Sequence, residues 1–404
     1  MGCRWGLLFI MFVSVSVLSG CWSQKELTDL ALVSAMGIDK NEKGKYVTTF
    51  QIVNPGNVAA GKQGSNQASP VTVFTITGNN VVETSREATK QIPRRLYYAH
   101  TNLVVISEKL AKEEGILKIF DAMDRDPEFR TTTTVIIARN TTAAEVVNKL
   151  TAIEKVPANK VIKTLDSSEK RWGEFFNVMI QDVIRDLVSA GREPMISGFY
   201  IKGNSKDGKK MNNLQQTTPD GQLVVNGMAV FKKGKLISWL QGEPARGASF
   251  ILNKVQSSDI NINWEGEKEA IAYELIRQNT KVSARLKKDG VPAVTIHTRA
   301  EGDIGELMVP IDITDPMALL KIEKVVEKEI EKEIKMAVER AQKDQSDILG
   351  FGEKVHLANP KAWKRMKQDW NEIHFPKTEV TVKVDAFVRR TGIRNKSYLS
   401  NMEK

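Results

Sequence analysis

Cysteine is nearly absent from this chain. The 404 residues include two, Cys3 and Cys21, and Cys3 lies in an N-terminal segment that we expect to be removed after export. With Cys21 alone left in the mature chain, no intramolecular disulfide can form. The fold must therefore rest on hydrophobic cores, for which a hydrophobic content of 41% is adequate.

Long hydrophobic runs are also missing. Residues 7–18 form an apolar run of twelve residues, whereas a helix that crosses the bilayer core needs about 20. No later stretch is long enough, and the mean hydropathy is −0.30. The sequence thus predicts no membrane-spanning segment in the mature chain.

The spacings that mark enzyme active sites and metal centres do not occur. No H-E-x-x-H pattern and no G-x-S-x-G turn is present. The four histidines are His100, His297, His356 and His374. We therefore predict that the protein is not an enzyme and binds no metal or cofactor.

Two weaker patterns have simpler interpretations. Asp124 and Asp126 could form an acid/base pair beside Pro127, but their spacing alone does not support that, and solvated carboxylates at a helix end are the default interpretation. Residues 350–354 contain two glycines but lack the Gly-Lys-Ser/Thr ending of a phosphate loop. We expect a turn there, after a long helix.

The N-terminus carries the most informative motif. Arg4, the apolar run 7–18 and a small-residue site follow the order of a secretory signal peptide. Leu18-Ser19-Gly20-Cys21 matches the lipobox of bacterial lipoproteins. We predict that a diacylglyceryl group is added to the Cys21 thiol and that the bond between Gly20 and Cys21 is cut.

The alternative, a transmembrane anchor with an incidental cysteine, is disfavoured because the apolar run is too short. Two acyl chains also satisfy the two-signal requirement for stable membrane anchoring. We expect the mature chain to be tethered to the outer face of a membrane.

The chain is basic, with a formal net charge of +10, or +9 without Arg4. For a chain held outside a membrane, nucleic acid is excluded as an expected partner, and an anionic lipid surface or a cell-wall polymer fits better. Ordinary solvated faces are the alternative for each local cluster. The clusters are Lys232/Lys233/Lys235, Lys361/Lys364/Arg365/Lys367 and Arg389/Arg390/Arg394/Lys396.

Apolar periodicity predicts an N-terminal α/β region over residues 21–200. Its expected strands are 31–38 and 46–53, which form a hairpin, followed by 71–77, 103–106 and 131–138, and residues 54–70 should form a mobile loop. Expected helices are 79–92, 109–123, 142–150 and a long helix over 168–190. That last helix carries Trp172, Phe175, Phe176, Met179, Val183 and Leu187 along one side, with Gly191 as its C′ residue.

Residues 201–222 have no periodicity and are expected to be either an interdomain linker or a long hairpin loop. In the C-terminal region, 223–404, we expect a hairpin over 224–240 and strands at 271–286, 293–301 and 379–388. Asp315 as N-cap and Pro316 at N1 open the longest helix, which should end near Gln345. Its apolar stripe favours packing across a sheet over a coiled coil. Trp363 and Trp370 are expected on one further short helix.

Several blocks distributed over the whole chain resemble the Ger(x)C lipoproteins, the C subunits of spore germinant receptors. They are Cys21-Trp22, Glu26-Leu27-x-Asp29-Leu30, Met36-Gly37-Ile38-Asp39, Asn102 to Ile106, Glu108-x-Leu110-Ala111, Arg125 to Arg130, Asp347 to Glu353, Pro360 to Trp363 and Val380 to Val388 before Gly392. The resemblance implies a multidomain α+β protein with mixed or antiparallel sheets flanked by amphipathic helices, in about three domains.

The resemblance also implies a function that spacing arguments do not reach. Family members act without catalysis beside two integral membrane subunits, A and B, in a complex that responds to nutrients, on the outer face of the spore's inner membrane. The alternative function is a lipid-anchored solute-binding protein that delivers a nutrient to a transporter. That alternative requires a cleft for a small ligand.

Overall fold

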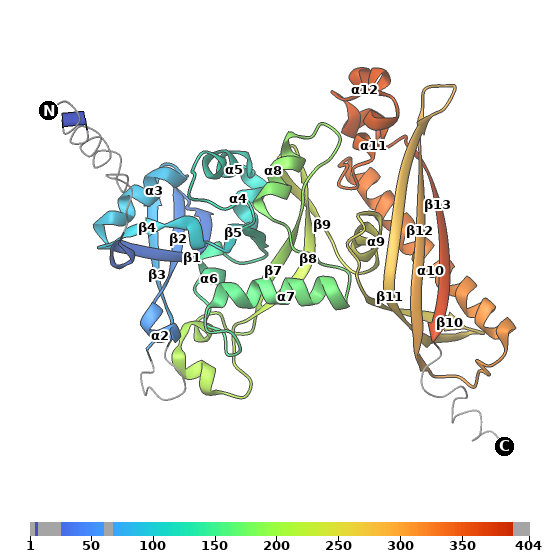
Figure 1. Cartoon of the computed structure of the whole chain (residues 1–404), viewed down its shortest axis with the longest axis horizontal. Coiled ribbons are helices and arrows are strands. Elements are labelled where there is room, and N and C mark those ends of the chain that lie inside the picture. Colours follow the sequence, from blue (N-terminus) through green and yellow to red (C-terminus); the bar gives the residue numbers. More distant parts are fainter. Residues whose placement is uncertain (1–4, 7–25, 60–67, 391–404) are drawn as a thin grey trace.

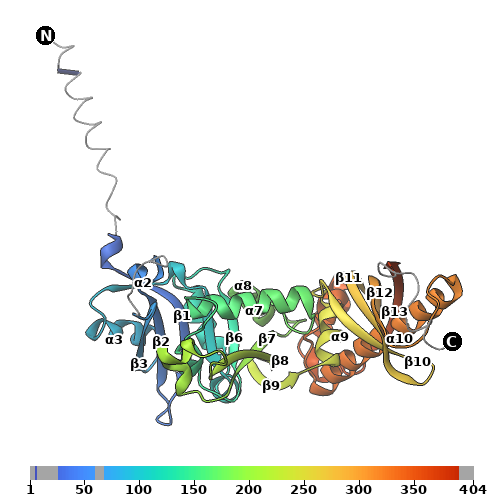
Figure 2. The same ribbon diagram turned by 90° about the horizontal axis from the view of Figure 1, so that it is seen from below.

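The structure, a computed structural model, describes residues 5–6, 26–59 and 68–390. They form an elongated molecule in which two mixed β-sheets follow one another along the long axis (Figures 1 and 2). Helices cover both sheets, which confirms the predicted α+β fold. None of the helices in the described part of the chain is both long and apolar enough to cross a membrane.

The first sheet has nine strands in the order β3-β2-β1-β5-β6-β7-β8-β9, with β4 paired to β1. Its centre, β1-β5-β6-β7, is parallel and both flanks are antiparallel. The strands are β1 (Leu30–Lys40), β2 (Tyr46–Val53), β3 (Val71–Gly78), β4 (Arg95–Tyr97), β5 (Leu103–Ser107), β6 (Thr134–Ala138), β7 (Met195–Lys202), β8 (Gln222–Lys232) and β9 (Lys235–Leu240). Every residue of β5 and β6 is buried, as expected of parallel strands covered on both faces.

In the described part of the chain, seven α-helices accompany this sheet. They are α2 (Pro55–Ala59), α3 (Val81–Glu87), α4 (Glu108–Glu113), α5 (Leu117–Asp124), α6 (Ala143–Val147), α7 (Pro157–Arg171) and α8 (Ile180–Val188). The expected hairpin of β1 and β2 and the strands at β3, β5 and β6 are present. The mobile loop predicted over residues 54–70 begins instead with the helix α2. Its residues 60–67 lie outside the described part.

Two predicted helices are each interrupted at a glycine. The helix expected over 109–123 is split into α4 and α5 at Gly115, whose φ of +93° favours glycine, and whose Cβ would meet the Gly234 carbonyl oxygen at 2.6 Å. The prediction of one long helix over 168–190 is also wrong. The helix α7 ends at Arg171, and α8 begins only at Ile180. Gly173 lies between them with a φ of +78°.

The aromatic residues assigned to that long helix therefore do not share one helical face. Phe175 and Phe176 lie in the extended segment between α7 and α8 and are buried, whereas Trp172 is 48% exposed. Gly191 is not the C′ residue of a helix, because the C-cap of α8 is Ser189. The aromatic stripe is thus partly core, as expected, but in an irregular segment.

Residues 203–221 connect two paired strands. β7 and β8 are antiparallel neighbours, from Met195 opposite Val230 to Lys202 opposite Gln222. Inside the connection, Asn213 donates to the Asp220 carbonyl and accepts from the Asp220 N–H. The pairing favours a long hairpin loop over a free linker, while the division of the chain near residues 200 and 223 stays a prediction.

The second sheet has the order β10-β11-β12-β13. Its strands are β10 (Ser258–Trp264), β11 (Glu267–Leu286), β12 (Pro292–Leu307) and β13 (Glu379–Arg390), and its helices are α9 (Glu243–Ile251), α10 (Pro316–Asp344), α11 (Phe351–Ala358) and α12 (Pro360–Met366). β12 and β13 are parallel and the other pairs antiparallel. Trp363 lies on α12, but Trp370 opens a separate π-helical turn, so the single short helix predicted for both is wrong.

The long helix α10 agrees with its prediction. Asp315 accepts a hydrogen bond from the Met317 N–H at 2.9 Å, and Pro316 is the first helical residue. The apolar stripe from Ile322 to Ala341 is buried, and α10 packs against β13, β10 and α9. One helix across a sheet, the favoured alternative, accounts for the stripe (Figure 1).

Candidate functional site

The predicted lipidation site lies outside the described residues. Gly20 and Cys21 precede Glu26, where the described segment 26–59 begins. A short turn (Leu27–Asp29) leads from there into β1, and Leu30 at the start of β1 pairs with Arg95 of β4. Arg95 therefore lies at the edge of the first sheet where the segment that follows the lipobox enters it.

A cavity of about 760 Å³ opens beside this point. Its floor is formed by buried or half-buried side chains, and its rim by four exposed arginines from α3, the residue before β4, the first residue of β4 and the residue after α5. The floor includes Met36, Ile92, Leu96, Tyr98, Met123 and the half-buried Phe129, and the rim arginines are Arg86, Arg94, Arg95 and Arg125. We call it the arginine-rimmed cavity.

The floor of the arginine-rimmed cavity is apolar and uncharged. Tyr98 stacks on Phe129 with ring centroids 4.7 Å apart, and its hydroxyl donates to Ser85 Oγ at 2.8 Å. Burial raises the pKa of Tyr98 to about 12, so the phenol stays neutral at physiological pH. The lining also includes the carboxylates of Asp126 and Glu128, so a ligand here would meet hydrophobic surface together with four arginines and two acidic side chains.

The rim keeps an excess of positive charge. Arg95 pairs with Glu128 at 2.7 Å, and Arg125 pairs with Asp121 at 3.0 Å on an exposed helix surface. Among the described residues, no acidic side chain forms an ion pair with Arg86 or Arg94. These two guanidinium groups remain available to an anion, for which the planar fork of arginine is well suited.

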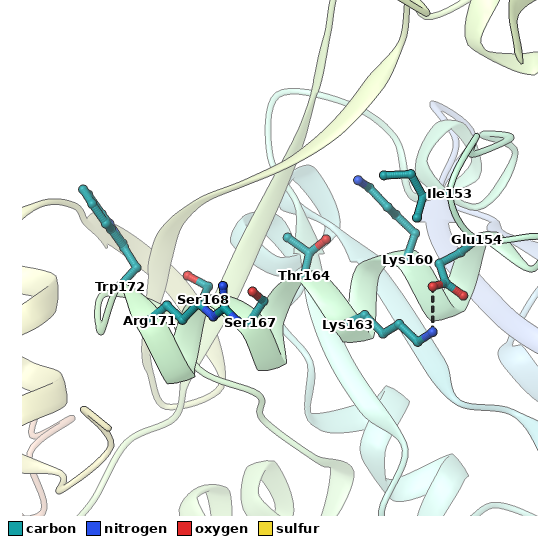
Figure 3. A pocket seen from close by; sticks show the side chains of 9 residues that line it. All are labelled: Ile153, Glu154, Lys160, Lys163, Thr164, Ser167, Ser168, Arg171 and Trp172. Carbon is teal, nitrogen blue, oxygen red and sulfur yellow. Dashed lines mark hydrogen bonds and ion pairs between the residues drawn. The ribbon is translucent and has the colours of Figure 1, made fainter. Parts of the chain in front are cut away.

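A second hollow follows the solvent side of α7. It has a volume of about 610 Å³ and is lined by Lys160, Lys163, Arg171 and their neighbours from Ile153 to Trp172. Figure 3 shows the side chains along one open helix surface, with Lys163 reaching Glu154 at 2.6 Å. Because α7 contacts both β8 and β10, this open surface lies over the connection between the two sheets.

Two buried carboxylates meet where the two sheets join. Glu193, just before β7, accepts from the Lys233 N–H at 3.0 Å and from Asn371 Nδ2 at 2.8 Å, and its own N–H donates to the Asp347 carbonyl. Asp347 is completely buried and accepts from Trp370 Nε1 at 2.8 Å. This junction ties the first sheet to the turn between α10 and α11.

The junction makes stability depend on pH. Burial raises the pKa of Glu193 to about 7, above its ordinary 4.5, and that of Asp347 to about 6, above 3.8. Between about pH 7 and pH 5 the folded state therefore binds more protons than the unfolded state, and stability increases as the pH falls. We expect a gain of roughly 3–4 kcal/mol over this window, at about 1.4 kcal/mol per pKa unit, measured by urea unfolding.

Glu193→Gln is the control for this prediction, because it removes one titrating group at nearly constant shape. The variant should lose at least half of the gain between pH 7 and pH 5. Carboxylates whose pKa is lowered, such as Glu114 and Glu301 at about 2, respond only below about pH 4.5. A wild-type midpoint that falls with acidification in this window would contradict the assignment.

The chemistry-bearing residues that the sequence singled out do not come together. His297 pairs with Asp385 at 2.7 Å on an exposed strand, His374 lies near Asp369, and His356 stacks on Trp363. Within residues 26–59 and 68–390, no group of three His, Cys, Asp or Glu side chains could hold a metal ion.

The two weaker sequence patterns have structural explanations. Asp126 accepts from the Glu128 N–H at 2.9 Å, which caps the turn after α5. Gly350, with a φ of +72°, is the N-cap of α11, so residues 350–354 form the expected turn and helix start. Asp347 caps that helix through the N–H groups of Phe351 and Gly352, a role that the sequence analysis missed.

The basic clusters of the sequence are partly neutralised. Lys232 and Lys233 both lie within ion-pair distance of Glu372, and Arg389 pairs with Glu301 at 3.0 Å. In contrast, Lys361, Lys364 and Arg365 on α12 form no ion pair among the described residues. Arg394 and Lys396 lie outside the described part.

Family models match most of the chain. A model described as "Spore germination protein N-terminal domain" matches residues 23–199, and one described as "Spore germination B3/ GerAC like, C-terminal" matches residues 226–392. The crystal structure of the GerBC protein superposes with a TM-score of 0.55 at 18% identity, over 88% of this chain and 96% of that one. This likeness shows a shared fold.

Curated relatives agree over their full lengths. Spore germination protein KC of Bacillus subtilis (strain 168) is 43% identical over 392 residues, 96% of each chain. Spore germination protein A3 of the same organism is 25% identical over 96% of this chain, and GerQC of Bacillus cereus is 21% identical over 96%. With both domain models matched in order and one relative at 43% identity, the chain belongs to the Ger(x)C family of spore germination proteins.

Proposed function

We propose that this protein is the lipid-anchored C subunit of a spore nutrient germinant receptor. It acts without catalysis in the assembly and signalling of that receptor, beside the integral membrane A and B subunits. Acylated Cys21 holds it on the outer face of the membrane. The single observation that carries the proposal is the match to spore germination proteins from residue 23 to residue 392 directly behind a lipobox.

The shape of the molecule supports a subunit that is held in a complex by contacts with other proteins. The molecule presents long helical and strand surfaces on both sheets (Figure 1). The arginine-rimmed cavity includes Arg95, which pairs with Leu30, close to the point where the predicted tether joins the first sheet. A two-chain anchor keeps the tethered domain at the membrane, and this raises its effective concentration near membrane partners.

Cys21→Ala tests the proposal, with Cys3→Ala as a matched control inside the signal peptide. We expect the Cys21 variant to leave the spore membrane fraction and nutrient-triggered germination to fall at least tenfold, because the two-chain anchor is lost. The Cys3 variant should behave as wild type in both assays. If the Cys21 variant left the membrane but germination persisted, anchoring would not belong to the receptor mechanism.

A further inference from the structure

We propose that the arginine-rimmed cavity binds the headgroup of an anionic phospholipid in the membrane to which the chain is tethered. The inference rests on the proposed lipid anchor and adds a second, non-covalent contact with the same bilayer. It assigns a ligand class to Arg86, to the adjacent Arg94 and Arg95, and to Arg125, which come from three segments and line one cavity.

The short segment between Cys21 and the first sheet keeps the cavity near the membrane. Leu30, which pairs with Arg95, follows Cys21 by nine residues. A fully extended chain of that length spans about 30 Å at most, so this end of the first sheet cannot lie farther than that from the acylated residue. The tether therefore holds the cavity within reach of the bilayer surface.

The chemistry of the rim fits a phosphodiester at an apolar interface. Arg86 and Arg94 have no acidic ion-pair partner among the described residues, and arginine binds phosphate oxygens in a bidentate manner. Val82, which also lines the cavity, is 56% exposed. Positive charge beside exposed apolar side chains is the pattern of surfaces that settle into the headgroup region.

The other basic surfaces are less suitable. Lys232, Lys233 and Arg389 are engaged by Glu372 and Glu301. The cations of α12, which have no ion-pair partner within residues 26–59 and 68–390, lie on the second half of the molecule, away from β4 along the long axis (Figure 1). They serve as a matched control, with similar exposure and charge but far from the tether.

The test uses the full mature chain with Cys21→Ala, so that binding does not depend on acylation. Vesicles of phosphatidylcholine alone are compared with vesicles that also contain phosphatidylglycerol, by cosedimentation at low and physiological salt. We expect selective binding to the phosphatidylglycerol vesicles that weakens with salt. Arg86→Gln/Arg94→Gln should weaken binding about 25-fold, at about fivefold per cation near an anionic surface.

Lys361→Gln/Lys364→Gln removes the same charge on α12 and should leave vesicle binding within about twofold of the parent, since these cations lie far from the tether. Equal loss in both double variants, or no preference for phosphatidylglycerol, would overturn the inference. Free glycerol phosphate that binds as tightly as the vesicles would overturn it in favour of a soluble anion. Unchanged melting temperatures exclude misfolding.

The two proposals fail separately. If phosphatidylglycerol binding requires Arg86 and Arg94 while Cys21 is dispensable for germination, the anchor proposal fails and the cavity assignment holds. If Cys21 is required but the vesicles do not bind, only the cavity assignment fails.

Discussion

Arg246→Ala is expected to lower the free energy of unfolding by about 3–5 kcal/mol, because it leaves a buried charge without its partner. Arg246 of α9 donates through Nε to Glu333 Oε2 at 2.8 Å and through Nη2 to Glu333 Oε1. Its Nη1 also donates to the Asp259 carbonyl at 3.0 Å. Glu333 lies on α10 and is fully buried, and burial raises its pKa.

Urea denaturation of the variant and of Lys332→Ala measures this effect. Lys332 is the neighbour of Glu333 and forms exposed pairs with Glu329 and Glu243, so its loss should cost less than about 1 kcal/mol. Replacing both partners, with Arg246→Met/Glu333→Leu, should recover most of the stability. Similar losses of unfolding free energy for Arg246→Ala and Lys332→Ala would show that the buried pair contributes no more than an exposed one.

Asp347→Ala is the second large effect that we expect. The side chain accepts from the N–H groups of Phe351 at 3.0 Å and Gly352 at 2.7 Å, and from Trp370 Nε1. All three donors are buried, and an unpaired buried donor costs about 1–3 kcal/mol. The substitution should therefore lower the free energy of unfolding by roughly 3 kcal/mol or more.

The matched control is Asn359→Ala, which removes a helix cap of the same kind from an exposed site. Asn359 accepts one hydrogen bond, from the Ala362 N–H at 3.0 Å, so about 1 kcal/mol is expected. Both variants are measured by urea unfolding at pH 8, where the Asp347 carboxylate is ionised. Trp370 fluorescence should change with Asp347→Ala alone, and equal effects of the two caps would contradict the assigned role.

Sequence motifs predicted the elements that are stabilised by residues close to one another in the sequence. Asp315-Pro316 marks a helix start by chemistry within one turn, and the stripe that follows repeats at helical spacing, so α10 was predictable almost to its end. The breaks at Gly115 and Gly173 were not, because what requires glycine there is a neighbour distant in sequence: the Gly234 carbonyl in one case and Val255 in the other.

Family membership was predictable because the resembling blocks extend along the whole chain, and the comparisons confirm it. The arginine-rimmed cavity was not, since the adjacent Arg94 and Arg95 give no sign in the sequence that Arg86 and Arg125 join them when α3, β4 and α5 pack. Glu193 and Asp347 also look like ordinary surface acids until the sheets join. The lipidation of Cys21 remains a prediction.

The pairing of β7 with β8 limits how such proteins can exchange parts. The N-terminal family model ends at residue 199 and the C-terminal one begins at residue 226, yet the strands on either side of that border belong to one sheet. A chimaera joined there would pair β7 from one paralogue with β8 from another. Its success would depend on matching register and cross-strand side chains, so the two halves are expected to be inherited together and not recombined as separate cassettes.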